Sequence, residues 1–191
     1  MKYYIMFGPP GAGKGTHASA AAVKYNLHHI STGELLRAEI TAGTELGLKA
    51  KSLIDAGNLV PDEVVEGMIE SRFNSVKDVE GFLLDGFPRT IRQAEDLDKM
   101  LEQRGEKVTA VISLCIPDEV IYKRLAHRAQ VEGRADDASP EIIANRIENY
   151  HKSTEPLIDY FKAKGNYHEV DGNAETVEIN RARVFNLIDN L

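Results

Sequence analysis

The chain has 191 residues, of which 42% are hydrophobic and 28% charged, the balance of one ordinary globular domain. Its 15 glycines and 7 prolines are too few for a collagen-like or low-complexity chain, and no apolar run reaches the ~18 residues that a membrane span needs. A net charge of −7 disfavours a general nucleic-acid binder.

The N-terminal region differs in charge from the rest of the chain. Residues 1–30 contain three lysines and no acid, so the remaining residues carry a net charge of −10. A locally positive start on an acidic protein suits a small anionic ligand. The apolar residues 1–7 are followed by no small-residue cleavage site, so they predict a strand rather than a signal peptide, and we expect a cytoplasmic protein.

Short apolar stretches alternate with helical stretches along the chain. This alternation predicts a single α/β domain, residues 1–191, with three layers: a parallel sheet and helices on both of its faces. Ligands of such folds bind beyond the carboxyl ends of the strands. Strands are predicted at residues 2–7, 27–30, 81–85, 108–116 and 167–170, helices at residues 14–25, 35–42, 46–56, 61–73, 91–104, 117–128, 140–164 and 175–191, and a polar loop at residues 130–139.

Local signals refine this pattern. Ser31 and Glu34 form the sequence S-x-x-E, which predicts a capped helix start. Cys115 lies in an apolar run and is predicted to be buried. As the single cysteine, it excludes an internal disulfide and a multi-cysteine zinc site. The adjacent His28 and His29 are predicted to be ordinary strand-end residues.

The strongest motif is GPPGAGKGT, residues 8–16, which follows a strand and opens a helix. Its glycines let backbone N–H groups surround a phosphate, the helix N-terminus adds its dipole, and Lys14 reaches the outer phosphates. The general motif has Ser or Thr directly after the lysine. Here Gly15 precedes Thr16, which leaves direct ligation of magnesium by the Thr16 hydroxyl open. A guanine-nucleotide switch would also carry an N-K-x-D element, which the sequence lacks.

Two further motifs follow the phosphate loop in order: STGELLR at residues 31–37 and LLDGFPRT at residues 83–90. Together the three motifs resemble the adenylate kinase family of nucleoside monophosphate kinases, and the likeness runs from the first strand to the last helix. The resemblance implies a P-loop core with two mobile parts, a helical segment at residues 31–60 that binds AMP and a lid at residues 127–137 over ATP. The lid is short and holds no cysteine, as in zinc-free members.

The resemblance assigns one set of residues to AMP. Thr32 and Gln93 are implied to recognise adenine, and threonine favours AMP because relatives selective for UMP or CMP usually carry alanine there. Arg37 and Arg89 match phosphate clamps, and planar guanidinium groups suit a phosphate dianion. The implied AMP site comprises Thr32, Arg37, Asn58, Leu59, Val60, Gly86, Phe87, Pro88, Arg89, Gln93, Arg134 and Arg146.

A second set is implied to surround ATP and the transferred phosphate. Asp85 ends an apolar strand beside the phosphate loop, where a carboxylate is placed to hold magnesium through water. Arg124 matches an arginine near the adenine of ATP, and Ala174 matches a position whose backbone carbonyl meets that adenine. The implied ATP site comprises Gly11, Ala12, Gly13, Lys14, Gly15, Thr16, Arg124, Arg128 and Ala174, and the implied catalytic set comprises Lys14, Asp85, Arg89, Arg128, Arg134 and Arg146.

The implied reaction transfers the γ-phosphate of ATP to AMP and gives two ADP, with Mg²⁺ and without zinc. No general base is needed, because the second pKa of a phosphate monoester is about 6 and the acceptor is already ionised near neutral pH. Catalysis is then electrostatic and positional: Lys14, magnesium and the arginines stabilise charge, and lid closure excludes water.

Two alternatives remain open at this point. A pyrimidine monophosphate kinase is disfavoured by Thr32 and by Thr90, where pyrimidine-specific relatives often carry asparagine. A non-catalytic nucleotide sensor is disfavoured by the number of charges expected to converge. The expected partners are ATP, AMP and ADP, with no nucleic acid and no membrane, and we expect a monomer.

Overall fold

The computed structural model describes all 191 residues and confirms the predicted α/β architecture. All strand pairs are parallel, and β1 lies at the centre with later strands on both sides, so the loop that follows β1 lies where the strand order changes direction. The sheet has the order β2-β3-β1-β4-β5 and consists of β1 (Lys2–Phe7), β2 (Leu27–Ser31), β3 (Gly81–Asp85), β4 (Ala110–Cys115) and β5 (Tyr167–Asp171).

Nine α-helices and two short turns of other helical types connect and flank the strands. The helices are α1 (Lys14–Tyr25), α2 (Thr32–Ala42), α3 (Glu45–Asp55), α4 (Asp62–Ser75), α5 (Ile91–Glu102), α6 (Asp118–Glu132), α7 (Pro140–Asn149), α8 (Leu157–Ala163) and α9 (Val177–Asp189), and the turns are η1 (Ala135–Asp137) and η2 (Tyr150–Thr154).

The alternation of side chains along β1 divides the core into two layers. Tyr3 and Ile5 belong to the larger apolar cluster, which lies between the sheet and α2, α4, α5 and α8. Tyr4 and Met6 belong to the second cluster, which lies between the sheet and α1 and α9. Because β1 is covered on both faces, it is apolar at nearly every position, as expected for a central parallel strand.

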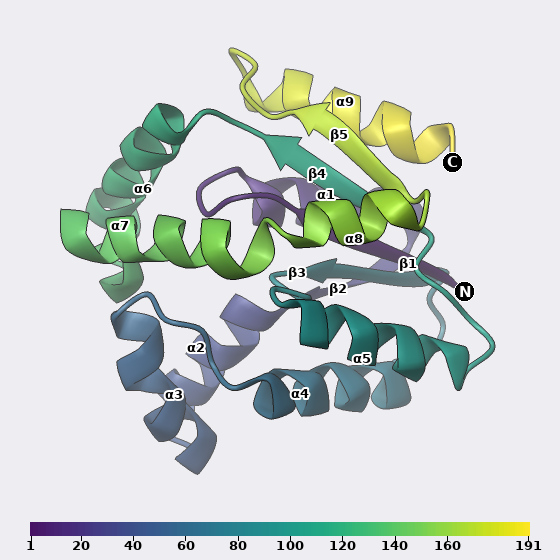
Figure 1. Ribbon diagram of the computed structural model, residues 1–191, viewed down its shortest axis with the longest axis horizontal. Coiled ribbons are helices and arrows are strands. Elements are labelled where there is room, and N and C mark those ends of the chain that lie inside the picture. The colour runs from purple at the N-terminus through teal and green to yellow at the C-terminus, as the bar shows by residue number, and fades with distance from the viewer.

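The helical pairs α2–α3 and α6–α7 project from the end of the sheet at which the strand arrowheads point (Figure 1). Both termini lie at the opposite end. The carboxyl ends of β1 and β3 therefore open toward the two helical pairs, and this end of the sheet is where the sequence motifs place the ligands.

The prediction of a single long helix at residues 140–164 is wrong. The structure divides this stretch into three segments: α7, the π-helical turn η2 and α8. Pro156 explains the interruption, because proline has no amide hydrogen and its ring clashes with the carbonyl one turn earlier. Tyr150, in the turn, packs its ring 6.2 Å from that of Phe7, so the irregular segment is anchored on the core.

The region between α6 and α7 is also more ordered than predicted. The helix that was expected to end near residue 128 continues to Glu132 and ends at Gly133, whose φ of 62° lies in the left-handed region. The expected polar loop at residues 130–139 thus contains the last turn of α6 and the 3₁₀ turn η1. Ser139 then caps α7 by accepting a hydrogen bond from Ile142 N–H.

The prediction that Cys115 is buried is wrong. Cys115 is the last residue of β4 and its side chain is exposed, as is that of Asp171, its partner at the end of β5. The rest of the run, Val111, Ile112 and Leu114, is fully buried. No helix of the chain combines the length and the apolar character that crossing a membrane requires.

Candidate active site

The phosphate loop has the backbone that its glycines predict. Gly8 has a φ of 132°, and a Cβ there would lie 2.6 Å from the Leu114 carbonyl oxygen, so only glycine fits against β4. Gly13, with a φ of 92°, is the N-cap of α1, and no side chain caps its first turn. Backbone N–H groups at this helix start are therefore left for an anion.

Lys14 folds back over the same loop. Its Nζ donates hydrogen bonds to the carbonyl oxygens of Gly8 and Pro9, at 2.9 and 2.8 Å. Burial lowers the pKa of Lys14 to about 7; the Asp85 carboxylate opposes this shift, and the charges of the surrounding arginines add to it. A bound polyphosphate would add negative charge beside Lys14 and favour its protonated form.

Asp85 ends β3 next to the phosphate loop. Burial alone would raise its pKa, but the neighbouring His29 and the charge on Lys14 lower it, so the carboxyl is ionised at neutral pH. His29 Nε2 lies 3.6 Å from Asp85 Oδ2. The prediction that His29 is an ordinary strand-end residue is therefore wrong: it lies in the middle of β2 and faces this carboxylate.

The residues around Asp85 fit a magnesium ion held through water. A Cβ at position 15 would lie 3.3 Å from Asp85 Oδ2, so Gly15 keeps the carboxylate open toward the phosphate loop. Magnesium typically uses one or two carboxylates together with substrate phosphates and water. Thr16 is exposed in the first turn of α1.

A polar cleft of about 660 Å³ lies over the phosphate loop, and none of its lining residues is hydrophobic. Seven cationic side chains line it against three carboxylates, although the whole protein is acidic. A cleft of this charge suits a polyanion of small size. Its cationic residues are Lys14, Arg37, Arg89, Arg124, Arg128, Arg134 and Arg146.

A second, inner cavity adjoins this cleft and is lined by both apolar and polar groups. Leu36, Ile54 and Val65 supply apolar walls from α2, α3 and α4, and Thr32 and Gln93 supply buried polar groups. The inner cavity also includes Asn58, Leu59 and Val60, as predicted. Six residues line both the inner cavity and the polar cleft: Gly33, Arg37, Gly86, Arg89, Arg134 and Arg146.

Backbone and side-chain contacts fix the polar residues of the inner cavity. The Thr32 hydroxyl donates to the Gly86 carbonyl at 3.0 Å, and Arg89 Nε donates to the same carbonyl at 2.7 Å. Burial lowers the pKa of Arg89, and the charge of Asp85 opposes this shift. Phe87 and Pro88 line an adjoining cavity with Tyr150 and not the inner cavity itself.

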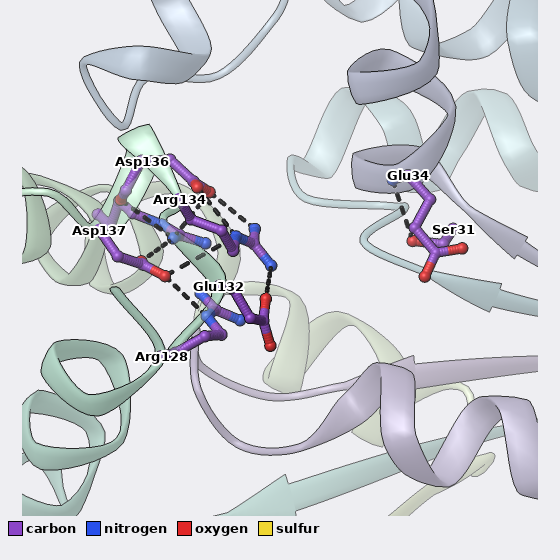
Figure 2. Close-up of polar contacts among 8 residues, drawn as sticks. Ser31, Glu34, Arg128, Glu132, Arg134, Asp136 and Asp137 are labelled. Carbon is purple, nitrogen blue, oxygen red and sulfur yellow. Dashed lines mark hydrogen bonds and ion pairs between the residues drawn. The ribbon is translucent and has the colours of Figure 1, made fainter. Parts of the chain in front are cut away.

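The predicted lid arginines converge on two aspartates (Figure 2). Arg134 binds Asp136 with two hydrogen bonds, Nε to Oδ1 at 3.0 Å and Nη2 to Oδ2 at 2.9 Å. Arg128 binds Asp137, and Arg146 contacts both aspartates. Arg128 Nη2 is buried without a partner, so it has donor capacity left for an anion in the polar cleft.

The charged groups of this network shift the pKa of one another. The pKa of Asp136 falls to about 2: burial would raise it, but the hydrogen bond from Arg134 and the charge of Arg146 outweigh burial. Burial lowers the pKa of Arg146 to about 10, against the attraction of Asp136 and Asp137. Asp136 and Asp137 lie in the predicted lid, but the sequence analysis assigned them no role. Their position next to Arg134 in the sequence is the one signal that could have indicated these ion pairs.

Arg124 lies apart from this network. Its guanidinium donates to the carbonyls of Gly11 and Ala12, both at 3.4 Å, and to that of Gly172 at 3.1 Å. It thereby joins the phosphate loop to the loop after β5. Ala174, in that second loop, donates its N–H to Asn180 Oδ1 and does not line the polar cleft.

The AMP segment predicted at residues 31–60 begins as the sequence indicates. The Ser31 hydroxyl accepts a hydrogen bond from Glu34 N–H at 3.3 Å and so caps α2 (Figure 2). At its far end the segment contacts α7: Asn145 Nδ2 donates to the Ala56 carbonyl and to Asn58 Oδ1, both at 2.8 Å. Asn145 carries contacts that no sequence motif indicated, and so does Asp62, whose Oδ1 accepts a hydrogen bond from Gln93 Nε2 at 2.7 Å.

Comparisons with known proteins agree with this geometry. The family model described as adenylate kinase matches residues 6–166. An adenylate kinase of Stenotrophomonas maltophilia is 46% identical over 175 residues, which are 92% of this chain and 93% of that protein. One of a Synechococcus strain is 48% identical, with 91% and 89% covered, and one of a Nocardioides strain is 46% identical, with 97% and 96% covered. The sequence motifs form the phosphate loop and contribute residues to the polar cleft and the inner cavity. By the family model and these relatives, the chain belongs to the adenylate kinase family.

Proposed function

We propose that the protein transfers the γ-phosphate of ATP to AMP, giving two ADP, with magnesium bound to ATP. One observation carries the proposal: the polar cleft and the inner cavity share four arginines, Arg37, Arg89, Arg134 and Arg146. A phosphate at this junction would contact the same cations from either cavity. Two nucleotides, one in each cavity, would then meet at their phosphates.

In this proposal ATP binds in the polar cleft. The N-terminal amides of α1 and Lys14 bind its phosphates, and Arg128, Arg134 and Arg146 stabilise the charge that is spread over the transferred group. Asp85 would hold the magnesium ion through water, and the ion would neutralise charge on the phosphate oxygens. Arg124 lies beside the loop that contains Ala174, where the adenine of ATP would bind.

AMP binds in the inner cavity. Thr32, Gln93 and the backbone of residues 58–60 surround its base, and Arg37 and Arg89 bind its phosphate with planar donors. No side chain acts as a general base, because the attacking phosphate oxygen is ionised near neutral pH. Residues 31–60 and residues 127–137 act as an AMP segment and a lid, which close to bring the phosphates in line and exclude water.

The test is a coupled assay of ADP formation from ATP and Mg²⁺ with AMP, UMP or CMP as acceptor. The proposal expects turnover with AMP and a much lower kcat/KM with UMP and CMP. A preference for a pyrimidine nucleotide would indicate a pyrimidine monophosphate kinase, and binding of ATP and AMP without turnover would indicate a sensor. Gel filtration and elemental analysis test the proposed monomer and zinc-free lid, and cell fractionation tests the proposed cytoplasmic location.

A further inference from the structure

We propose that Asp62 is a specificity-determining positioning residue, which fixes the orientation of the Gln93 amide and thereby the purine that the inner cavity accepts. The inference rests on the proposed function, since it concerns the base of the acceptor nucleotide. It adds a residue that lines none of the three cavities described above and that acts on the substrate only through Gln93.

Both ends of the Gln93 amide are occupied by protein groups. Gln93 is in the first turn of α5, is 2% exposed and lines the inner cavity. Its Nε2 donates to Asp62 Oδ1 at 2.7 Å, and its Oε1 accepts the backbone N–H of Arg89 at 2.7 Å. The amide is therefore held between a carboxylate on α4 and the backbone just before α5.

The chemistry of these two partners permits one orientation. An ionised carboxylate only accepts hydrogen bonds, and a backbone N–H only donates them. Rotating the amide by half a turn would place Oε1 against the carboxylate of Asp62 and the Nε2 hydrogens against the N–H of Arg89. Both contacts would become repulsive, so the oxygen and the nitrogen of Gln93 cannot exchange places while Asp62 is charged.

Asp62 is itself held in place by its neighbours. It is the first residue of α4, where the helix dipole stabilises a negative charge. The Thr90 hydroxyl lies 3.4 Å from both carboxylate oxygens, and the same hydroxyl accepts a hydrogen bond from Gln93 N–H. Thr90, Asp62 and Gln93 thus form one connected set at the starts of α4 and α5.

A fixed amide distinguishes purines that differ in their hydrogen-bonding edge. After its two protein contacts, Gln93 keeps one free N–H and one oxygen lone pair. Adenine presents an amino donor at position 6 beside an acceptor at N1, whereas hypoxanthine presents a 6-oxo acceptor beside an N1–H donor. An amide free to rotate could match either edge, and a fixed one matches only one. The Asp62 carboxylate therefore makes the enzyme select AMP against IMP.

The experiment compares kcat/KM for AMP and for IMP, with ATP and Mg²⁺, in the wild-type protein and in Asp62→Asn. An asparagine side chain either donates or accepts, so it no longer repels the rotated amide, and only the Arg89 N–H then opposes the rotation of Gln93. We expect the AMP-to-IMP ratio to fall about tenfold, the size of effect that loss of a charged hydrogen bond produces. The matched control is Glu63→Gln, which removes the same charge from the same helix turn at an exposed ion pair with Arg92. Its ratio is expected to stay within about twofold of wild type.

A double-mutant cycle tests whether Asp62 acts through Gln93. In a Gln93→Met background, Asp62→Asn is expected to leave the AMP-to-IMP ratio unchanged. A ratio unchanged in the single Asp62→Asn variant, or an equal fall in the Gln93→Met background, would overturn the proposal. A wild-type protein that makes no ADP from ATP and AMP would instead refute the proposed function. Thermal melting checks folding, and Asp62→Ser, whose hydroxyl also donates or accepts, replaces Asp62→Asn if that variant does not fold.

Discussion

Arg128 Nε donates a hydrogen bond to Asp137 Oδ2 over 2.7 Å, and the carboxylate that accepts it is completely buried. The same carboxylate contacts Arg146 and lies 3.8 Å from Arg134 Nε. One buried anion therefore positions three cations that come from α6, from the turn before η1 and from α7. These cations all line the polar cleft, so the protein holds them together there by its own charges.

Replacing Asp137 by asparagine is expected to destabilise the protein by about 3 kcal/mol, because it leaves three neighbouring cations without their shared anion. The arginines keep partial access to water, which places the effect at the lower end of the range for buried ion pairs. Urea unfolding of Asp137→Asn measures the loss. Glu141→Gln, at an exposed position in the first turn of α7, is the control and should change the unfolding free energy by less than about 0.5 kcal/mol. Equal effects in the two variants would contradict the role of Asp137.

The low pKa of Asp136 predicts a dependence of stability on pH. Arg134 and Arg146 lower this pKa from 3.8 to about 2 against the effect of burial, so the folded state binds the proton more weakly than the unfolded state. The resulting stability is present above about pH 4 and is lost as the pH falls toward 2, and it is on the order of 2 kcal/mol. Unfolding free energies of wild type and Asp136→Asn at pH 6 and pH 3 measure it. The gap between the two proteins should shrink at pH 3, and a constant gap would exclude this linkage.

The fold could be predicted from the sequence because its signals are local. The phosphate loop, the apolar β1 and the Ser31 cap each depend on neighbouring residues, and the structure confirms them. The exposure of Cys115 could not be predicted, because exposure at the end of a strand depends on the tertiary packing around it. The interruption after residue 149 has a local signal in Pro156, because proline disfavours a continuous helix.

The lining of the two cavities could be predicted in part, and their internal contacts could not. The motif residues Lys14, Asp85 and Arg89 line the polar cleft. Leu36, Ile54 and Val65 line the inner cavity without having been predicted there, and the predicted Ala174 lines neither cavity. Three contacts of the site join residues that are 31 to 87 positions apart in the sequence. They are His29 with Asp85 on the neighbouring strand, Asp62 with Gln93, and Asn145 with Asn58. Such contacts depend on tertiary packing, for which a single sequence carries no periodic or spacing signal.

Lys14→Met and Arg89→Ala are each expected to lower kcat by a factor of about 10³ or more while the protein stays folded, because each removes a cation from the proposed phosphate sites. Steady-state ADP formation measures the rate, and circular dichroism checks the fold. Lys123→Met, which removes an exposed cation on α6, is the control and should keep the wild-type rate. A Lys14→Met protein with a near wild-type rate would count against the assignment of the phosphate loop.

Thr32→Ala is expected to relax the selection of AMP over CMP and UMP. The Thr32 hydroxyl is buried against the Gly86 carbonyl at the wall of the inner cavity, so its removal enlarges the space beside the base. The carbonyl keeps its hydrogen bond from Arg89 Nε, and we expect a loss of stability of no more than about 1 kcal/mol. A competition assay with AMP, CMP and UMP measures selectivity. Thr41→Ala, on the exposed side of α2, is the matched control, because its hydroxyl donates only to the Arg37 carbonyl within the helix. Selectivity that is the same in Thr32→Ala, Thr41→Ala and wild type would refute a role for Thr32 in base recognition.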